Sequence, residues 1–195
     1  MVPNHATQTD PYLHEAKGAS TAVAGTVLTA TRSGTATFQA PATGGSGSVV
    51  KTTSSLVNSL ITGTSLIPLD DTIPQIGEGT EFITISYTPS AIGNRIRVTA
   101  NTYGAYSVAA KVTAALFEGT TANALAATAE TVAASNDVVQ HTLSYEGTVS
   151  ALTALTYRLR IGGSTAGTYT LNGSAGARLF GGVGYSNLVV TEIKA

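Results

Sequence analysis

Apolar and polar residues alternate along most of the chain after residue 63, with the spacing of two that is typical of β-strands. Within residues 81–88 this alternation places Ile83, Ile85 and Tyr87 on one face, and Pro89 ends the segment. The same pattern predicts strands at residues 96–100, 108–117, 139–145, 157–161, 169–171 and 188–190, and a short one at 66–69.

These elements are short and numerous, and Gly, Pro, Asn and Asp separate them. Residues 121–134 are rich in Ala, but their Thr residues and lack of charged pairs suit an extended loop or an edge strand equally well. We therefore expect an all-β fold, an antiparallel sandwich of two sheets, and most specifically an eight-stranded jelly roll.

Residues 1–62 have a different pattern, with few large apolar side chains. Residues 7–18 sustain no period and contain Pro11, which predicts an extended tether. Residues 25–30 and 34–40 are prone to form strands and predict a short hairpin, and residues 42–48 have the composition of a flexible linker. Leu56, Val57, Leu60 and Ile61 fit either a helical stripe or the start of a strand that crosses to another subunit.

We therefore predict an arm and linker at residues 1–62 and a knob domain at residues 63–195. Such an arm has too few core-sized side chains to offset its ordering entropy, so we expect it to order only against a partner.

Composition narrows the function classes. The 195 residues carry 10 basic and 11 acidic side chains, a charged fraction of 11% against roughly 25% in ordinary soluble domains. Without a cluster of Lys or Arg we expect no nucleic-acid partner and no membrane insertion. We also expect synthesis in the host cytoplasm, because the start lacks a signal-peptide pattern. A surface with so little charge favours self-association, so we expect a homo-oligomer.

The chain has no Cys, which excludes disulfides and thiolate chemistry. His14 and Glu15 begin an H-E-x-x-H pattern whose second His is absent, and His5 stands alone nearby. Only a trimer axis that gathers three copies of one His would make a metal site there, and we expect none. His141 lies in an alternating strand and is expected to be hydrogen-bonded or exposed.

Acidic residues gather at Asp70, Asp71, Glu78 and Glu81. Two carboxylates at the right separation serve glycoside hydrolysis, but the Asp pair has turn chemistry and the Glu pair flanks a strand start, so we expect turn and surface roles. The glycines at 181–184 have the wrong spacing for a nucleotide loop, and the sequon at 172–174 is expected to be a turn. We predict no catalytic residue, no metal and no cofactor, and therefore no enzyme.

Tyr103 and Tyr106 flank Gly104. At a loop tip they would stack on a sugar or contact a protein receptor, and in a half-buried strand they would belong to the core. Both readings stay open from the sequence.

Several separated segments resemble the C-terminal domain of fibre and spike proteins of tailed bacteriophages. They are residues 67–82 (IPLDDTIPQIGEGTEF), 87–91 (YTPSA), 168–173 (TYTLNG), 177–183 (ARLFGGV) and 190–193 (VTEI). The resemblance covers residues 63–195 and implies a trimeric jelly roll of the tumour-necrosis-factor type.

The front of the chain is similar to the opening of phage head-fibre and head-spike proteins. The matching residues are Asp10, Pro11, Tyr12, Leu13, His14, Glu15, Lys17 and Gly18, with residues 24–28 (AGTVL) after them. Related sequences have Pro after His-Glu, where this chain has Ala16. The resemblance implies that this arm attaches the protein to a capsid or tail adaptor protein.

The leading hypothesis is thus a structural virion protein, a trimeric head fibre or decoration protein anchored by its N-terminal arm. The alternative is the receptor-binding tip of a tail fibre that recognises host surface carbohydrate. A polysaccharide-degrading spike is the least favoured reading, because no carboxylate pair stands out.

Overall fold

The computed structural model describes residues 44–195 in full and the backbone of residues 27–30 and 36–39. The chain divides into two units, Met1–Thr43 and Gly44–Ala195. In the first unit, β1 (Val27–Ala30) pairs antiparallel with β2 (Ala36–Gln39), which confirms the predicted pairing of these two segments. The anchoring segment predicted at residues 10–18 lies outside the described residues.

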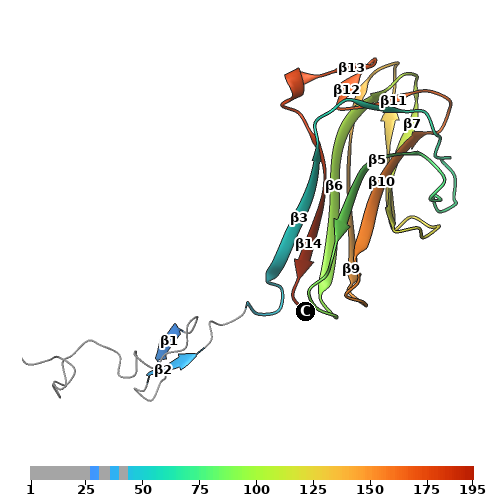
Figure 1. The fold of residues 1–195 in the computed structure, drawn as a ribbon. Helices are drawn as coiled ribbons and strands as arrows, with labels where there is room; N and C mark the ends of the chain where they lie inside the picture. Colours follow the sequence, from blue (N-terminus) through green and yellow to red (C-terminus); the bar gives the residue numbers. More distant parts are fainter. Residues whose placement is uncertain (1–26, 31–35, 40–43) are drawn as a thin grey trace, which may run out of the picture. The chain divides into compact units, whose positions relative to one another are not determined.

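The second unit is a sandwich of two antiparallel sheets (Figure 1). The four-stranded sheet has the order β5 (Thr80–Tyr87), β10 (Leu155–Gly163), β7 (Ala110–Glu118) and β8 (Ala126–Val132). In the larger sheet β3 (Val49–Val57), β14 (Ser186–Ile193) and β6 (Arg95–Tyr106) are neighbours, and β9 (Val138–Thr148) pairs with the far edge of β6. The long β6 also pairs with β11 (Tyr169–Leu171), which pairs with β4 (Ile61–Gly63).

The strand order identifies the topology. The eight strands of at least seven residues, numbered one to eight along the chain, form one sheet in the order 1-8-3-6 and the other in the order 2-7-4-5. This is the arrangement of a jelly roll, in which two Greek keys fold over each other. The predicted all-β, eight-stranded jelly roll is therefore confirmed. The described residues contain no α-helix, only a short 3-10 helix, η3 (Phe180–Gly182).

The main core lies between the two sheets and follows the predicted alternation. Ile83, Ile85 and Tyr87 of β5 are buried in it together with Ile96 and Val98 of β6. The alternation breaks at one place, where the register of β5 against β10 shifts and Phe82 is buried beside Ile83. A β-bulge of this kind turns two consecutive side chains toward the core.

A second, smaller core covers the outer face of the four-stranded sheet. Ala115 and Phe117 of β7 point away from the main core and are covered by Ile67, with Ile76 and Ala124 beside it. The loop of residues 64–79 that carries Ile67 lies across this sheet face, so the strand predicted at 66–69 is wrong. Of this short apolar run only Ile67 is buried, whereas Leu66 and Leu69 are exposed. Residues 126–132 form the edge strand β8, one of the two predicted alternatives.

The folded unit begins earlier than predicted. Residues 49–57, assigned from the sequence to an arm and linker, form β3 and pair with β14 of the same chain over their whole length. β3 is an edge strand in which six of nine residues are exposed and none is fully buried, so its sequence VVKTTSSLV needs few large apolar residues. The scarcity of large apolar residues that placed residues 49–57 in the arm is thus that of an edge strand, and the boundary lies at 43/44 instead of 62/63.

Candidate functional site

The two tyrosines for which the sequence left a receptor contact or a core position open are buried. Tyr103 and Tyr106 lie in β6, with exposed fractions of 8% and 1%. The Tyr106 hydroxyl donates a hydrogen bond to the Thr165 carbonyl at 2.7 Å. The Tyr103 ring contacts the ring of Phe180, at 5.8 Å between centroids. Of the two alternatives, the strand in the core is therefore confirmed and the loop tip is wrong, because β6 continues through Gly104.

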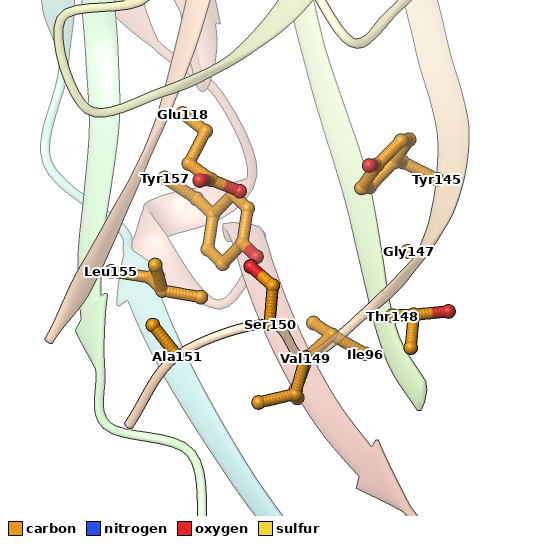
Figure 2. Close-up of a pocket in the computed structure, with 10 residues that line it drawn as sticks. All are labelled: Ile96, Glu118, Tyr145, Gly147, Thr148, Val149, Ser150, Ala151, Leu155 and Tyr157. Carbon is orange, nitrogen blue, oxygen red and sulfur yellow. The ribbon is translucent and has the colours of Figure 1, made fainter. Parts of the chain in front are cut away.

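A small pocket opens at one end of the sandwich (Figure 2). The side chains of Glu118 and Tyr157 lie together on one side of it, Tyr145 lies on the other, and Val149 and Leu155 supply apolar wall. Burial raises the pKa of the Tyr157 hydroxyl, and the charge of the neighbouring Glu118 carboxylate raises it further, so the phenol stays protonated.

This pocket has the chemistry of a polar cleft but the size of a few water molecules. Its volume is about 50 Å³, whereas pockets that enclose a small-molecule ligand measure roughly 300–1,000 Å³. Glu118 is also the only carboxylate that lines it. A two-carboxylate glycosidase mechanism therefore has no place here.

The acidic residues singled out from the sequence have structural roles. Asp70 caps its own turn by accepting hydrogen bonds from the Thr72 backbone and hydroxyl, and these bonds lower the pKa of the Asp70 carboxyl. Glu78 accepts a hydrogen bond from the Gln75 backbone. Glu81 pairs with Arg158 at 3.0 Å. The predicted turn and surface roles are confirmed.

Asp70 and Asp71 also border an open groove of about 430 Å³. Its remaining wall comes from Ile73, Pro74 and residues 124–127 at the start of β8. Both carboxylates come from one turn, so no second acid faces them across the groove.

His141 is a buried, hydrogen-bonded residue. It has an exposed fraction of 1%, and its Nε2 lies 3.1 Å from the Val112 carbonyl oxygen. Burial lowers the pKa of His141, against the opposing effects of the Val112 hydrogen bond and the Glu130 charge. The predicted hydrogen-bonded role is confirmed, whereas His5 and His14 lie outside the described residues.

Asn172 joins three segments of the chain. The sequence predicted only a turn at this residue. Its φ of 59° is the left-handed conformation that Asn tolerates, and its side chain is buried. The amide donates to the carbonyls of Val57 and Ser59, each at 2.9 Å, and its oxygen accepts a hydrogen bond from the Ser186 hydroxyl at 2.7 Å. The Asn-Gly dipeptide signals the backbone conformation, but only the fold shows the partners.

One broad surface is left uncovered by the described residues. The outward side chains of the larger sheet form what we call the open sheet face. They are Thr52, Ser54 and Leu56 of β3, Asn187, Val189 and Thr191 of β14, Arg97, Thr99 and Asn101 of β6, and Thr142, Ser144 and Glu146 of β9. Asn101 hydrogen-bonds to Asn187 and Thr142 across the strands, and Arg97 pairs with Glu146 at the end of the face. Most of this face is neutral, with short side chains.

The described residues form neither a metal ligand set nor a membrane-spanning helix. No three His, Asp or Glu side chains there gather as a metal ligand set would. Among the same residues, no helix is long and apolar enough to span a bilayer.

No protein-family model matches the sequence, and no curated protein matches it significantly. Several solved structures resemble the fold. The Eiger TNF of S. frugiperda matches with a TM-score of 0.43 at 11% identity, over 74% of this chain and 94% of that one. A structure of infectious bursal disease virus, Gx strain, matches with a TM-score of 0.32 at 10% identity, over 83% and 39%. The enzymatically active domain of bacteriophage CBA120 tailspike protein 4 matches with a TM-score of 0.26 at 13% identity, over 64% and 19%. Likeness at this level concerns the fold alone.

Proposed function

We propose that this chain is a structural virion component of a tailed bacteriophage, a homotrimeric head fibre or decoration protein that attaches through the segment before Gly44. Its role is attachment and display and not catalysis. It is made in the host cytoplasm and assembled onto a capsid or a tail adaptor protein.

The observation that carries the proposal is the difference between the outer faces of the two sheets. The chain covers the four-stranded sheet with its own loop and a small core around Phe117. The open sheet face receives no such cover from the described residues, and its side chains are mostly Ser, Thr and Asn. Packing neutral side chains against a second copy desolvates no unpaired ion, so association costs little electrostatic energy.

The resemblance of residues 10–18 and 63–195 to phage fibre proteins supports the same assignment. The geometry also distinguishes the two ends of the sandwich. The backbone of Gly47 donates to the Lys194 carbonyl, and that of Lys194 donates to Ser48, so the chain enters the sandwich beside its C-terminal residues. In Figure 1 the hairpin of β12 (Gly173–Ser174) and β13 (Ala177–Arg178) lies at the opposite end.

Self-association is tested by the mass of the full chain in solution, measured by size-exclusion chromatography with light scattering. We expect three copies for the wild type. Val189→Glu places a charge at the centre of the open sheet face and should give a folded monomer. Ala129→Glu adds the same charge on β8, outside that face, and should leave the trimer intact. A monomeric wild type, or equal behaviour of the two variants, would refute the trimer through this face.

Attachment is tested separately, by assembling particles with a chain that lacks residues 1–43. We expect the shortened protein to fold but to be missing from purified particles. Its retention on the particle would contradict the anchoring role of the N-terminal segment.

A second candidate function is recognition of a host surface carbohydrate by the tip. The exposed aromatic side chains of Phe180 and Tyr185, and not the buried Tyr103 and Tyr106, favour it.

A further inference from the structure

The loop between β11 and β14 is held at both of its ends. We call residues 173–185 the distal loop, since they lie at the end of the sandwich away from residues 44–48 (Figure 1). Its stem is closed by the hydrogen bond from the Ser186 hydroxyl to Asn172, and Leu179 donates to the Asn172 carbonyl within it. A compact loop with fixed ends is an Ω-loop, a kind of segment that often carries function.

Backbone strain is concentrated in this loop and its stem. Among the described residues, four amino acids other than glycine have a positive φ: Ala175 and Phe180 lie in this loop, and Asn172, of a residue type that tolerates this conformation, lies in its stem. A bulky residue such as Phe180 at φ 54° is a true outlier. Strained conformations persist only where the surrounding structure fixes them, and they cluster at binding and catalytic sites.

The same loop exposes large apolar side chains. Phe180, Val183 and Tyr185 have exposed fractions of 66%, 82% and 55%. The ring of Phe180 is supported from one side by the buried ring of Tyr103. A cluster of exposed apolar residues on a rigid loop marks an interaction site, because a prearranged loop loses little entropy on binding.

The same loop carries one cationic side chain. Arg178 is the only charged residue between residues 161 and 191. Its guanidinium lies over Gly182, where a Cβ atom would come within 2.7 Å of Nη1. Arg178 is exposed and forms no ion pair with any residue that the structure describes. Its bidentate fork is therefore available to a carboxylate from outside.

We propose that the distal loop binds a carboxylated saccharide. The rings of Phe180 and Tyr185 stack on the apolar faces of sugar residues, and Arg178 pairs with the carboxylate. This inference rests on the second candidate function, carbohydrate recognition by the tip. It is independent of the open sheet face and of the N-terminal segment.

The test uses the full chain and measures binding by calorimetry and by saturation-transfer NMR. Oligogalacturonate and hyaluronan fragments serve as carboxylated probes, and maltohexaose serves as the neutral probe. Arg178→Gln should weaken binding of a carboxylated probe about tenfold or more, because it removes a charge-assisted pair. Phe180→Gly keeps the positive φ without strain and removes the ring, and Tyr185→Ser removes the second ring; each should weaken binding by a similar factor.

Two variants at the other end of the sandwich are the matched controls. Ile92→Ser removes a side chain with the same exposed fraction as Phe180, 66%, and Arg95→Gln removes an exposed cation. Both should bind like the wild type. Absence of binding to every carboxylated probe would overturn the proposal, as would equal affinity for maltohexaose or an Arg178→Gln variant with unchanged affinity. If Phe180→Gly changed the oligomeric mass instead of saccharide binding, the loop would be a contact between copies. None of these outcomes bears on particle attachment, which is measured with the shortened chain.

Discussion

Glu192 is a buried carboxylate that makes no ion pair in the described structure. It accepts hydrogen bonds from the Tyr87 hydroxyl at 2.5 Å, from Asn94 at 2.6 Å and from the Ser90 hydroxyl at 2.7 Å. Burial alone would raise the pKa of Glu192, but these bonds outweigh burial and hold the pKa at about 2. The residue fastens the last strand, β14, to the loop between β5 and β6.

The first prediction is that Glu192→Gln lowers the free energy of unfolding at pH 7 by about 3 kcal/mol. The Gln side chain would turn an N–H donor toward the donors of Tyr87, Ser90 and Asn94. These groups would also lose the charged oxygen that accepts their hydrogen bonds. Because the folded pKa lies below the ordinary value of 4.5, the carboxylate stabilises the wild type fully above about pH 4.5, and this contribution is lost as the pH falls toward 2. Urea unfolding at pH 7 and pH 3 measures both effects.

The difference between wild type and Glu192→Gln should shrink at pH 3. Glu146→Gln, at an exposed carboxylate of the open sheet face, is the control and should cost below about 1 kcal/mol. A pH-independent difference for Glu192→Gln would contradict the assignment of a buried charge.

The second prediction concerns His141 and a higher pH range. Burial lowers the pKa of this imidazole below its ordinary 6.5, so the unfolded chain binds the proton more readily than the folded one. We expect the free energy of unfolding to fall as the pH drops from 7 to 5. His141→Gln should remove this slope while destabilising the protein at every pH. Urea midpoints at pH 5, 6, 7 and 8 give the slopes for the wild type and for His141→Gln.

The loop that covers the four-stranded sheet depends on one glycine of β10. A Cβ atom at Gly162 would lie 2.6 Å from the Ser65 carbonyl oxygen and 2.7 Å from the Ile67 amide nitrogen. Both contacts are with backbone, which cannot rotate away as a side chain can. Gly162 thus allows the loop to approach closely enough to bury Ile67 against Phe117.

The third prediction is that Gly162→Ala destabilises the fold by about 2 kcal/mol, the typical cost of overpacking. Gly77→Ala is the matched control within the covering loop, since a Cβ at that position meets nothing within 4 Å. Thermal unfolding followed by circular dichroism measures both variants. Equal melting temperatures for the two would show that the loop is not held by this close approach.

Periodicity predicted the central strands well, because a strand buried on one face must alternate. Ile83, Ile85, Ile96 and Val98 are examples. Periodicity failed for the edge strand β3 for a physical reason. β3 is held by backbone pairing with β14, and backbone pairing places little constraint on which side chains the strand carries. The place of Tyr103 stayed open because Gly104 is compatible with a tip, whereas the structure needs this glycine because a Cβ there would meet the Thr170 carbonyl oxygen and the Tyr169 ring.

At the scale of the whole molecule, the boundary at 43/44 makes a direct prediction. A chain of residues 44–195 should melt within about 2 °C of the full chain, because it keeps every strand of the sandwich. A chain that begins at residue 63 lacks β3 and most of β4. It should melt lower by more than about 5 °C or aggregate, since the edge of β14 is then exposed. Differential scanning calorimetry of the three chains decides between the two boundaries.

The neighbouring positions of Gly47 and Lys194 have a practical consequence for engineering. A peptide fused after Ala195 would emerge at the end of the sandwich where the chain enters. If this end attaches to the particle, the peptide would face the particle. Cargo meant for the outside belongs instead between Gly176 and Ala177, where both residues are exposed and the insertion leaves the sandwich strands untouched. Such an insertion interrupts the distal loop just before Arg178, so the saccharide binding proposed there would be lost.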